Sequence, residues 1–462
     1  NGGGGYDWAI QSVFGRLTYN YDQRYLFETT MRYDGSSRFP TDSKYGFFPS
    51  ASAGWRISEE AFMEPVKEVI SNLKLRASYG FTGNTEIGVY ESLATLGTSN
   101  WILGNQLVSG FFPNKIPNPD LKWERTGQFD IGLDLGLFNN RLRITTDYYK
   151  KKTTDLLYSV AVPATSGYQT MLKNIGSIEN QGYELSIESD NLTGAFSWTT
   201  AFNIAFNRNK VLELGGEEYK EMAEGDGHLK TGSVRRLIVG EPIGVFYGYR
   251  FDGIFQNEEE CKQQTSSASP IGVGLRRYKD LNGDGKVDAA NDREILGDAN
   301  PKFFGGLTNT FAYKGFELNV FLQYSYGNKI LNYNAMELEN PTGGQNAYAD
   351  MVNRWTPENP SNIYPKATTN RALLVSDRFI EDGSYLKLKT LSLSYSFPKI
   401  NLKHIQGLRL YVTGQNLLTW TKYRGYDPEV SYRGASTLEA GEDFGGYPQS
   451  RTFMFGIKLD IK

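Results

Sequence analysis

Hydrophobic and polar residues alternate along the stretch from Lys122 to Lys152. Apolar side chains occupy the odd positions from Phe129 to Leu137, with polar residues or glycine between them. A period of two places the apolar side chains on one face of a β-strand. Asn139 and Asn140 then favour a tight turn, after which the alternation resumes at Leu142. The pattern predicts a long antiparallel hairpin.

The arms of this hairpin are long enough to cross a lipid bilayer. A spanning strand needs about nine to eleven residues, whereas an average strand has about five or six. The same alternation recurs and predicts about 15 strands. They cover residues 10–20, 24–34, 46–57, 72–84, 121–137, 141–153, 176–190, 195–208, 229–239, 244–255, 301–313, 315–327, 384–397, 406–420 and 450–461.

Short turns alternate with long connections between these strands, as periplasmic turns and external loops do in bacterial outer-membrane barrels. The predicted fold class is therefore all-β, a transmembrane antiparallel β-barrel. One longer connection, Ser58 to Ser71, predicts a small amphipathic helix on the periplasmic rim. Single-chain bacterial barrels have an even number of strands. The odd count predicts that residues 1–462 are the C-terminal portion of a larger barrel, whose N-terminal part lies outside this sequence.

Composition narrows the possible functions. The formal net charge of -3 gives no basic field for nucleic acid. Aromatic residues make up 14% of the chain, which suits the aromatic girdles of a barrel in contact with outer-membrane lipid. The mean hydropathy is -0.47, and no apolar run is long enough for a transmembrane helix. Cys261, His228 and His404 are the only cysteine and histidines, so we expect no enzyme.

Several longer stretches carry a family resemblance. They include YDGSSRFP at 33–40, GFFPSASAGWRISEE at 46–60, LKLRASYGFTGN at 73–84, NPDLKWERT at 118–126, NIGSIENQGYELSI at 174–187, NRWTPENP at 353–360 and FIEDGSYLKLKTLSLSYSFP at 379–398. Together they resemble the SusC-like (SusC/RagA) TonB-dependent outer-membrane transporters of Bacteroidetes. The resemblance covers essentially the whole chain.

This resemblance implies a 22-stranded barrel in the bacterial outer membrane, of which this chain would supply the last strands. It implies an N-terminal plug, energy from the TonB system, and a SusD-like surface lipoprotein as partner. It also implies a dimer of transporter–lipoprotein pairs. The expected function is import of oligomeric nutrients, with glycan and peptide cargo both open.

The segment DLNGDGKVD at 280–288 is similar to the front of a calcium-binding loop. Oxygen donors stand at positions one, three, five and nine, and Gly285 stands at position six. The predicted ligands are Asp280, Asn282, Asp284, Lys286 through its carbonyl, Asp288 and Asp292. Asn291 replaces the glutamate expected at position twelve. Bound Ca²⁺ and a solvated turn therefore both stay open.

Aromatic side chains in the expected external loops could stack on sugar rings or peptide side chains. The loops carry Trp101, Phe111, Phe112, Tyr168, Tyr333, Tyr348 and Trp355. The candidates for substrate contact are Trp101, Tyr348 and Trp355. Packing within the loops is the alternative, and Arg354 with Trp355 in NRWTPENP is interpreted as structural.

Two other classes of function compete with transport. One is a surface adhesin or assembly barrel that binds a partner without moving cargo. The other is a hydrolase, suggested by Glu439, Glu442 and Asp443, although a solvated acidic loop is the simpler interpretation. Ser233 and Ser450 lack a histidine in a recognisable motif, so a serine nucleophile is poorly supported.

Overall fold

The structure is a computed structural model. It describes residues 5–168, 170–222, 225, 228–229, 231–340, 346–369, 373–397, 405–429, 431–434, 436 and 438–461. The connection between the predicted strands at 384–397 and 406–420, together with His404 and the final Lys462, therefore falls wholly or largely outside the described residues. The chain divides into two compact units, Asn1–Leu185 with Asn209–Glu218, and Ser186–Arg208 with Tyr219–Lys462. We call them unit 1 and unit 2 and take each in turn.

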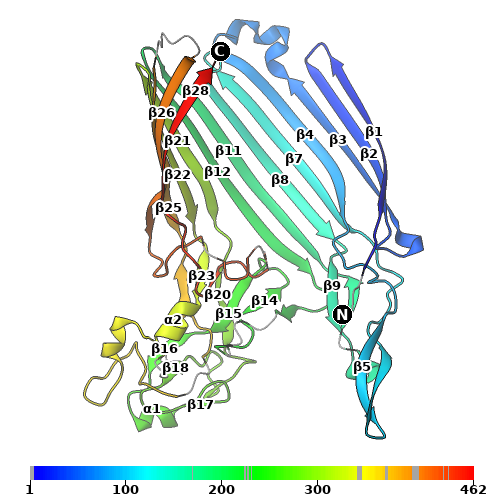
Figure 1. The fold of residues 1–462 in the computed structure, drawn as a ribbon, viewed down its shortest axis with the longest axis vertical. Helices are drawn as coiled ribbons and strands as arrows, with labels where there is room; N and C mark the ends of the chain where they lie inside the picture. The colour runs from blue at the N-terminus through cyan, green and yellow to red at the C-terminus, as the bar shows by residue number, and fades with distance from the viewer. Residues whose placement is uncertain are drawn as a thin grey trace. The chain divides into compact units, whose positions relative to one another are not determined.

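Unit 1 is built on long antiparallel strands joined by both tight turns and long connections (Figure 1). They are β1 (Ile10–Tyr21), β2 (Tyr25–Ser36), β3 (Tyr45–Arg56), β4 (Ile70–Asn84), β7 (Glu124–Leu137) and β8 (Leu142–Thr154), followed by most of β11 (Ser177–Thr193). Asp22 and Gln23 have φ of 50° and 57°, and Asn139 and Asn140 have 59° and 60°. Positive φ at successive residues matches the twist of the flanking strands, which confirms the predicted turn at Asn139 and Asn140.

Small hairpins and short 3₁₀ turns fill the long connections of unit 1. The strands are β5 (Leu96–Leu103), β6 (Gln106–Pro113), β9 (Leu157–Ala161) and β10 (Thr170–Asn174), and the 3₁₀ turns are η1 (Thr41–Ser43) and η4 (Ala164–Ser166). A small core of Phe39, Ile87 and Leu121 lies beneath them, with Trp123 packed against it. The sequence patterns did not predict these elements.

The helix expected between Ser58 and Ser71 is instead two 3₁₀ turns, η2 (Ile57–Glu59) and η3 (Ala61–Val66). Pro65 lies inside η3 and has no N–H to donate, so an α-helix cannot continue through it. Glu60 fixes the connection by accepting hydrogen bonds from Tyr25 and Trp55. The connection is therefore helical over two short stretches, but these are 3₁₀ turns, and Glu60 anchors them.

Unit 2 contains the remaining long strands and a folded set of loops. The strands are β12 (Phe196–Glu213, its last residues counted with unit 1), β21 (Phe303–Tyr313), β22 (Phe316–Tyr326), β25 (Tyr385–Ser396), β26 (Ile405–Thr421) and β28 (Thr452–Ile461). Hydrogen bonding gives one thirteen-stranded sheet in the order β1-β2-β3-β4-β7-β8-β11-β12-β21-β22-β25-β26-β28. Each strand of this sheet pairs with the strands that precede and follow it along the chain, when the small loop elements are not counted.

The loops of unit 2 form their own small sheets at one end of β21, β22 and β25 (Figure 1). Their elements are β13 (Tyr219–Glu221), β14 (Arg235–Ile238), β15 (Val245–Tyr249), β16 (Phe251–Ile254), α1 (Glu258–Lys262), β17 (Thr265–Ser266), β18 (Arg276–Tyr278), β19 (Lys286–Val287), β20 (Arg293–Asp298), β23 (Lys329–Asn332), α2 (Tyr333–Leu338), η5 (Ala349–Asn353), η6 (Asp377–Phe379), β24 (Ile380–Asp382) and β27 (Glu442–Asp443). Phe246, Leu331, Tyr333, Met336 and Phe379 are fully buried together. The loops therefore have a hydrophobic core of their own.

Two predicted spanning strands belong to these loops. Residues 229–239 yield only β14, and residues 244–255 yield β15 and β16 in two different small sheets. Both β14 and β15 are buried on successive residues, so neither has the one wet face that a spanning strand of a barrel shows. The large sheet accordingly has thirteen strands, and the other thirteen predicted segments all lie in it.

The two faces of the large sheet differ in chemistry as predicted. On unit 2, Leu318 lies beside Phe311 on one neighbouring strand and beside Leu393 on the other. The opposite face carries Arg409, which pairs with Glu317 at 2.6 Å, and Ser392, which shares a hydrogen bond with Thr413. Leu393, Phe453, Phe455 and Ile457 stay strongly exposed. An apolar face left bare over many strands is the signature of lipid contact.

Among the described residues, no helix is long and apolar enough to cross a membrane.

The sidedness of the sheet predicts opposite effects for the same charge on its two faces. Ile131, near the middle of β7, lies on the apolar face, and Ser78 lies on the polar face opposite Asp130. Ile131→Arg should destabilise the folded protein in lipid vesicles by about 2–4 kcal/mol, the range for a cation at the bilayer midplane. Ser78→Arg is the matched control and should cost far less. Equal losses in denaturant unfolding would contradict the assignment of faces.

Candidate functional site

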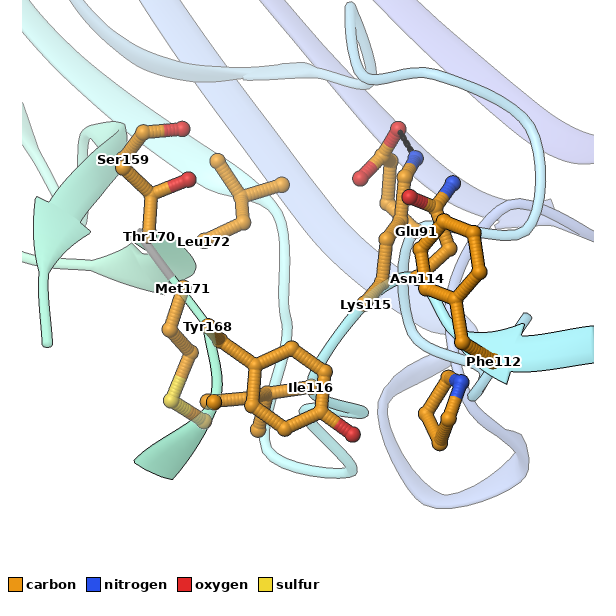
Figure 2. A pocket seen from close by; sticks show the side chains of 12 residues that line it. Glu91, Phe112, Asn114, Lys115, Ile116, Ser159, Tyr168, Thr170, Met171 and Leu172 are labelled. Carbon is orange, nitrogen blue, oxygen red and sulfur yellow. Dashed lines mark hydrogen bonds and ion pairs between the residues drawn. The ribbon is translucent and has the colours of Figure 1, made fainter. Parts of the chain in front are cut away.

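A pocket of about 430 Å³ lies among the loops of unit 1 (Figure 2). β9, β10 and the residues between them line one side, with Ser159, Tyr168, Met171 and Leu172. The segment from Phe112 to Ile116, together with Glu91, lines the other. Strands that leave the sheet at the same end therefore bring two connections together around one cavity.

The pocket combines apolar walls with one ion pair. Lys115 and Glu91 form a salt bridge, and their side chains keep 38% and 24% of their exposure. Phe112 and Tyr168 are two of the loop aromatics noted in the sequence, and both face the cavity (Figure 2). Such a lining can hold an apolar side chain while the ion pair binds a polar group beside it.

The β5–β6 hairpin of unit 1 exposes an unusual amount of apolar surface. Ile102, Leu103, Leu107 and Phe111 are each more than 70% exposed, and Trp101 is 60% exposed. Ile102, Leu107 and Phe111 share one face of the hairpin, and Trp101 and Leu103 share the other. The structure places the substrate candidate Trp101 here, outside the lining of the pocket.

The polar face of unit 1 carries a network of charges. Arg76 on β4 binds Asp134 on β7 through two hydrogen bonds and Asp147 on β8 through a third. A hollow of about 360 Å³ lies on this face, lined by Glu28, Arg76 and Asp130 among others. Charges of both signs keep the face wet.

In unit 2, the loop between β26 and β28 is tied to the polar face of β25. Lys387 on β25 is 1% exposed and binds Asp427 at 2.6 Å and also Glu429. Lys389 and Gln323 bind the same Glu429 carboxylate. Burial alone would raise the pKa of Glu429, but the hydrogen bonds from Lys387 and Lys389 outweigh it and hold that pKa below its ordinary value.

Of the three acidic residues considered for hydrolysis, Glu442 and Asp443 are buried inside the loops of unit 2. Glu442 is 1% exposed and binds the equally buried Arg235 at 2.8 Å, and Asp443 is fully buried and accepts a hydrogen bond from Tyr423. Burial and this hydrogen bond raise the pKa of Tyr423. The expectation of a solvated acidic loop is therefore wrong for Glu442 and Asp443, because β27 pairs with β23 inside the loops of unit 2.

The other two aromatic candidates pack inside unit 2. Tyr348 is partly buried against the hydrophobic core of the loops, and burial raises its pKa. The indole N–H of Trp355 donates to Gln256 at 3.1 Å. The bonding of Trp355 agrees with a structural role for NRWTPENP, and a substrate role for Trp101, Tyr348 or Trp355 stays a prediction.

The predicted calcium loop is held by its own hydrogen bonds. Asp280 accepts from the N–H groups of Gly283 and Gly285, and the buried Asp292 accepts from those of Leu281 and Asp288. Asn282 donates to Asp284, while Asp288 faces the Lys286 ammonium at 3.2 Å. In the described part of the chain, no three acidic, histidine or cysteine side chains converge as metal ligands. As arranged here, the carboxylates would have to turn to surround Ca²⁺. Binding of Ca²⁺ at this loop stays a prediction.

Sequence reasoning missed the unit 1 pocket and the Lys387 cluster. Phe112 and Tyr168 were visible as loop aromatics, but nothing in the chain shows that residues 112–116 and 168–172 meet. The sequence contains only a weak signal for the burial of Lys387, because LKLKT at 386–390 has the alternation of an ordinary strand. In both cases the partners are distant in sequence.

Removing calcium tests the predicted loop. If Ca²⁺ binds at 280–292, EDTA should accelerate proteolysis within the loop and added Ca²⁺ should reverse it, because ligation orders the carboxylates. Asp280→Asn should abolish the response, and Asp252→Asn, outside the predicted set, should preserve it. Identical digestion patterns with and without chelator would rule the ion out.

The lowered pKa of Glu429 predicts a pH-dependent loop. The contribution of Glu429 to the stability of the loop is complete above the ordinary glutamate pKa of about 4.3. It is lost as pH falls through the lowered pKa of the folded state. Glu429→Gln should lower the free energy of local opening by about 1–3 kcal/mol. Amide hydrogens of residues 422–429 should therefore exchange faster at pH 7. That difference from wild type should shrink toward pH 3. The exposed Glu358→Gln is the control, and a difference independent of pH would contradict the assignment.

Comparisons with known proteins agree with this architecture. The family described as "TonB dependent receptor-like, beta-barrel" matches residues 2–417. TonB-dependent receptor P3 of Formosa agariphila is 41% identical over 457 residues, which cover 97% of this chain and 45% of that protein. TonB-dependent receptor SusC of Bacteroides thetaiotaomicron is 33% identical over 472 residues, 98% of this chain and 44% of that protein. The chain thus spans a little under half the length of these relatives.

Solved structures give the same family. A structure of the RagAB peptide transporter matches with a TM-score of 0.81 at 28% identity, covering 98% of this chain and 48% of that one. The RagAB peptide importer in its "open-open" state matches with 0.81 at 27% identity, covering 98% and 47%. The family is one of outer-membrane β-barrel proteins. The chain belongs to the TonB dependent receptor-like β-barrel family and is of the SusC type.

Proposed function

We propose that this chain serves the TonB-dependent import of oligomeric nutrients across the bacterial outer membrane, together with a SusD-like lipoprotein. The observation that carries the proposal is the sidedness of the thirteen-stranded sheet. One face is apolar enough for lipid, and the other holds paired charges such as Arg76 with Asp134. A wall of this kind separates lipid from a hydrated path.

Peptides are the cargo that the unit 1 pocket suits best. Its apolar residues, including Phe112, Met171 and Leu172, come from both sides of the cavity, and the Lys115–Glu91 pair supplies both signs of charge. Peptides carry both apolar and charged side chains, whereas sugars present mainly hydroxyl groups. The RagAB structures, described as a peptide transporter and a peptide importer, support the same class of cargo.

The β5–β6 hairpin supports a protein partner on the outer surface. Its exposed Ile102, Leu103 and Phe111 would be costly to leave in water, at about 25 cal/mol for each Å² of apolar area. A surface lipoprotein could cover them. We assign the energy supply for import to TonB, in agreement with the family description.

Uptake of a fluorescent oligopeptide tests the proposal directly. Cells carrying the intact receptor should accumulate it in a TonB-dependent manner. Phe112→Ala with Tyr168→Ala should reduce uptake at limiting peptide about tenfold or more, since two aromatic contacts are lost. Tyr426→Ala, an 80% exposed aromatic outside the pocket, is the control.

Unchanged uptake in a strain that lacks the gene would overturn the transport proposal. Loss of partner binding in that strain, without any change in uptake, would favour the surface adhesin instead.

A further inference from the structure

A small pocket in the loops of unit 2 contains a buried cation that lacks a carboxylate partner. Ser269, Leu275, Arg276, Asn340, Pro365 and Leu373 are among the residues that line it, and its volume is about 40 Å³. A single water needs about 10–15 Å³ of such space. The pocket therefore has room for one small polar group, such as a carboxylate.

Arg276 is 9% exposed, and its guanidinium is only partly bonded. Its Nη2 donates to the backbone carbonyl of Glu339 at 3.1 Å, while its Nε is buried without a partner. Among the described residues, no carboxylate lies within salt-bridge distance of Arg276. Burial lowers the pKa of Arg276, and the nearby Tyr278 and Glu339 oppose that shift. A buried charge without a counterion is costly.

The surrounding carboxylates are already engaged. Glu339 is fully buried and its two oxygens bind Arg378 and Arg424 at 2.6 Å and 3.0 Å. Glu381 also binds Arg424, at 2.7 Å. Of the three guanidinium groups, those of Arg378 and Arg424 bind these two carboxylates, while Arg276 reaches only the backbone carbonyl of Glu339.

Asn340 adds a second unmet requirement to the same pocket. It is 4% exposed, and its Oδ1 atom is buried without a hydrogen-bond donor. Both unbonded atoms are closed to a water-sized molecule, so the two side chains must turn toward the pocket before an occupant can present an anionic acceptor to Arg276 and a donor to Asn340. A water could make both hydrogen bonds, but it would leave the charge of Arg276 unbalanced. A carboxylate with an N–H or O–H group beside it meets both needs.

We propose that the pocket around Arg276 and Asn340 binds a carboxylate that carries an adjacent hydrogen-bond donor. This chemistry occurs at the C-terminus of a peptide, where the donor is the last amide N–H, and in a uronic acid, where it is a hydroxyl. The inference rests on the proposed import function, because it names a group by which cargo is recognised.

Calorimetry on the intact receptor tests the pocket with small probes. N-acetylglycine offers a carboxylate and an adjacent N–H, and N-acetylglycinamide is its neutral counterpart. Galacturonate and its methyl ester make the same comparison for a sugar. The acid of at least one pair should bind at least tenfold more tightly than its neutral partner, as expected for charge-assisted hydrogen bonds. The pair that shows this preference identifies the source of the carboxylate.

Matched variants tie the binding to the pocket. Arg276→Met should weaken the acid probe about 10- to 100-fold, and Arg276→Lys should restore part of the loss. Arg277→Met is the control, because Arg277 is the next residue, pairs with Asp252 and Glu260, and does not line the pocket. Asn340→Leu should weaken N-acetylglycine and keep the preference for the acid, which covers the case in which Arg276→Met fails to fold.

Equal affinity of acid and neutral probes, or full affinity in both Arg276→Met and Asn340→Leu, would overturn the proposal and leave water as the occupant. TonB-dependent peptide uptake that persists under that result would leave the proposed function standing. If uptake did not depend on the gene while the acid probe still bound, only the proposed function would be contradicted.

Discussion

Backbone hydrogen bonding in contact with lipid is the constraint on which the rest of this structure depends. Hydrocarbon offers no hydrogen-bond partner, so each spanning strand must satisfy its N–H and C=O groups on neighbouring strands. The thirteen long strands do so in register with one another, from β1 through β28. Because their side chains alternate between faces, one pattern of residues serves both lipid and water. Leu318 and Glu317, adjacent on β22, meet opposite environments for this reason.

The loops of unit 2 solve a different problem, since they must hold a fixed shape outside the large sheet. They have a hydrophobic core around Phe246 and Phe379, and buried ion pairs join segments far apart in sequence. Arg235 reaches Glu442 across 207 positions of the chain. Breaking such a pair leaves an uncompensated buried charge, which costs about 3–5 kcal/mol. Specific pairs of this kind determine which loops contact each other. Arg276 differs, because no carboxylate among the described residues lies within salt-bridge distance of it.

Local periodicity made the large sheet predictable, because strand identity and facing are written in successive residues. The turn at Asn139 and Asn140 was predictable for the same reason. Residues 244–255 were misassigned as a spanning strand, because a continuous aromatic run such as VFYGY is compatible with a strand buried on both faces. The pocket, the Lys387 cluster and the burial of Glu442 depend on contacts between distant segments. Charge and aromatic content identified Phe112, Tyr168 and Glu442 as notable residues, but the sequence alone does not show what they contact.

The most direct measurement of the central claim is the environment of successive residues along one strand. Spin labels placed singly at positions 317–323 of β22, in the intact receptor with native cysteines replaced, report collision with oxygen in lipid and with a nickel chelate in water. Oxygen access should peak at 318, 320 and 322, and nickel access should peak at 317, 319 and 323. Uniform protection from both reagents, with no period of two, would place β22 inside a closed core and contradict a wall between lipid and water.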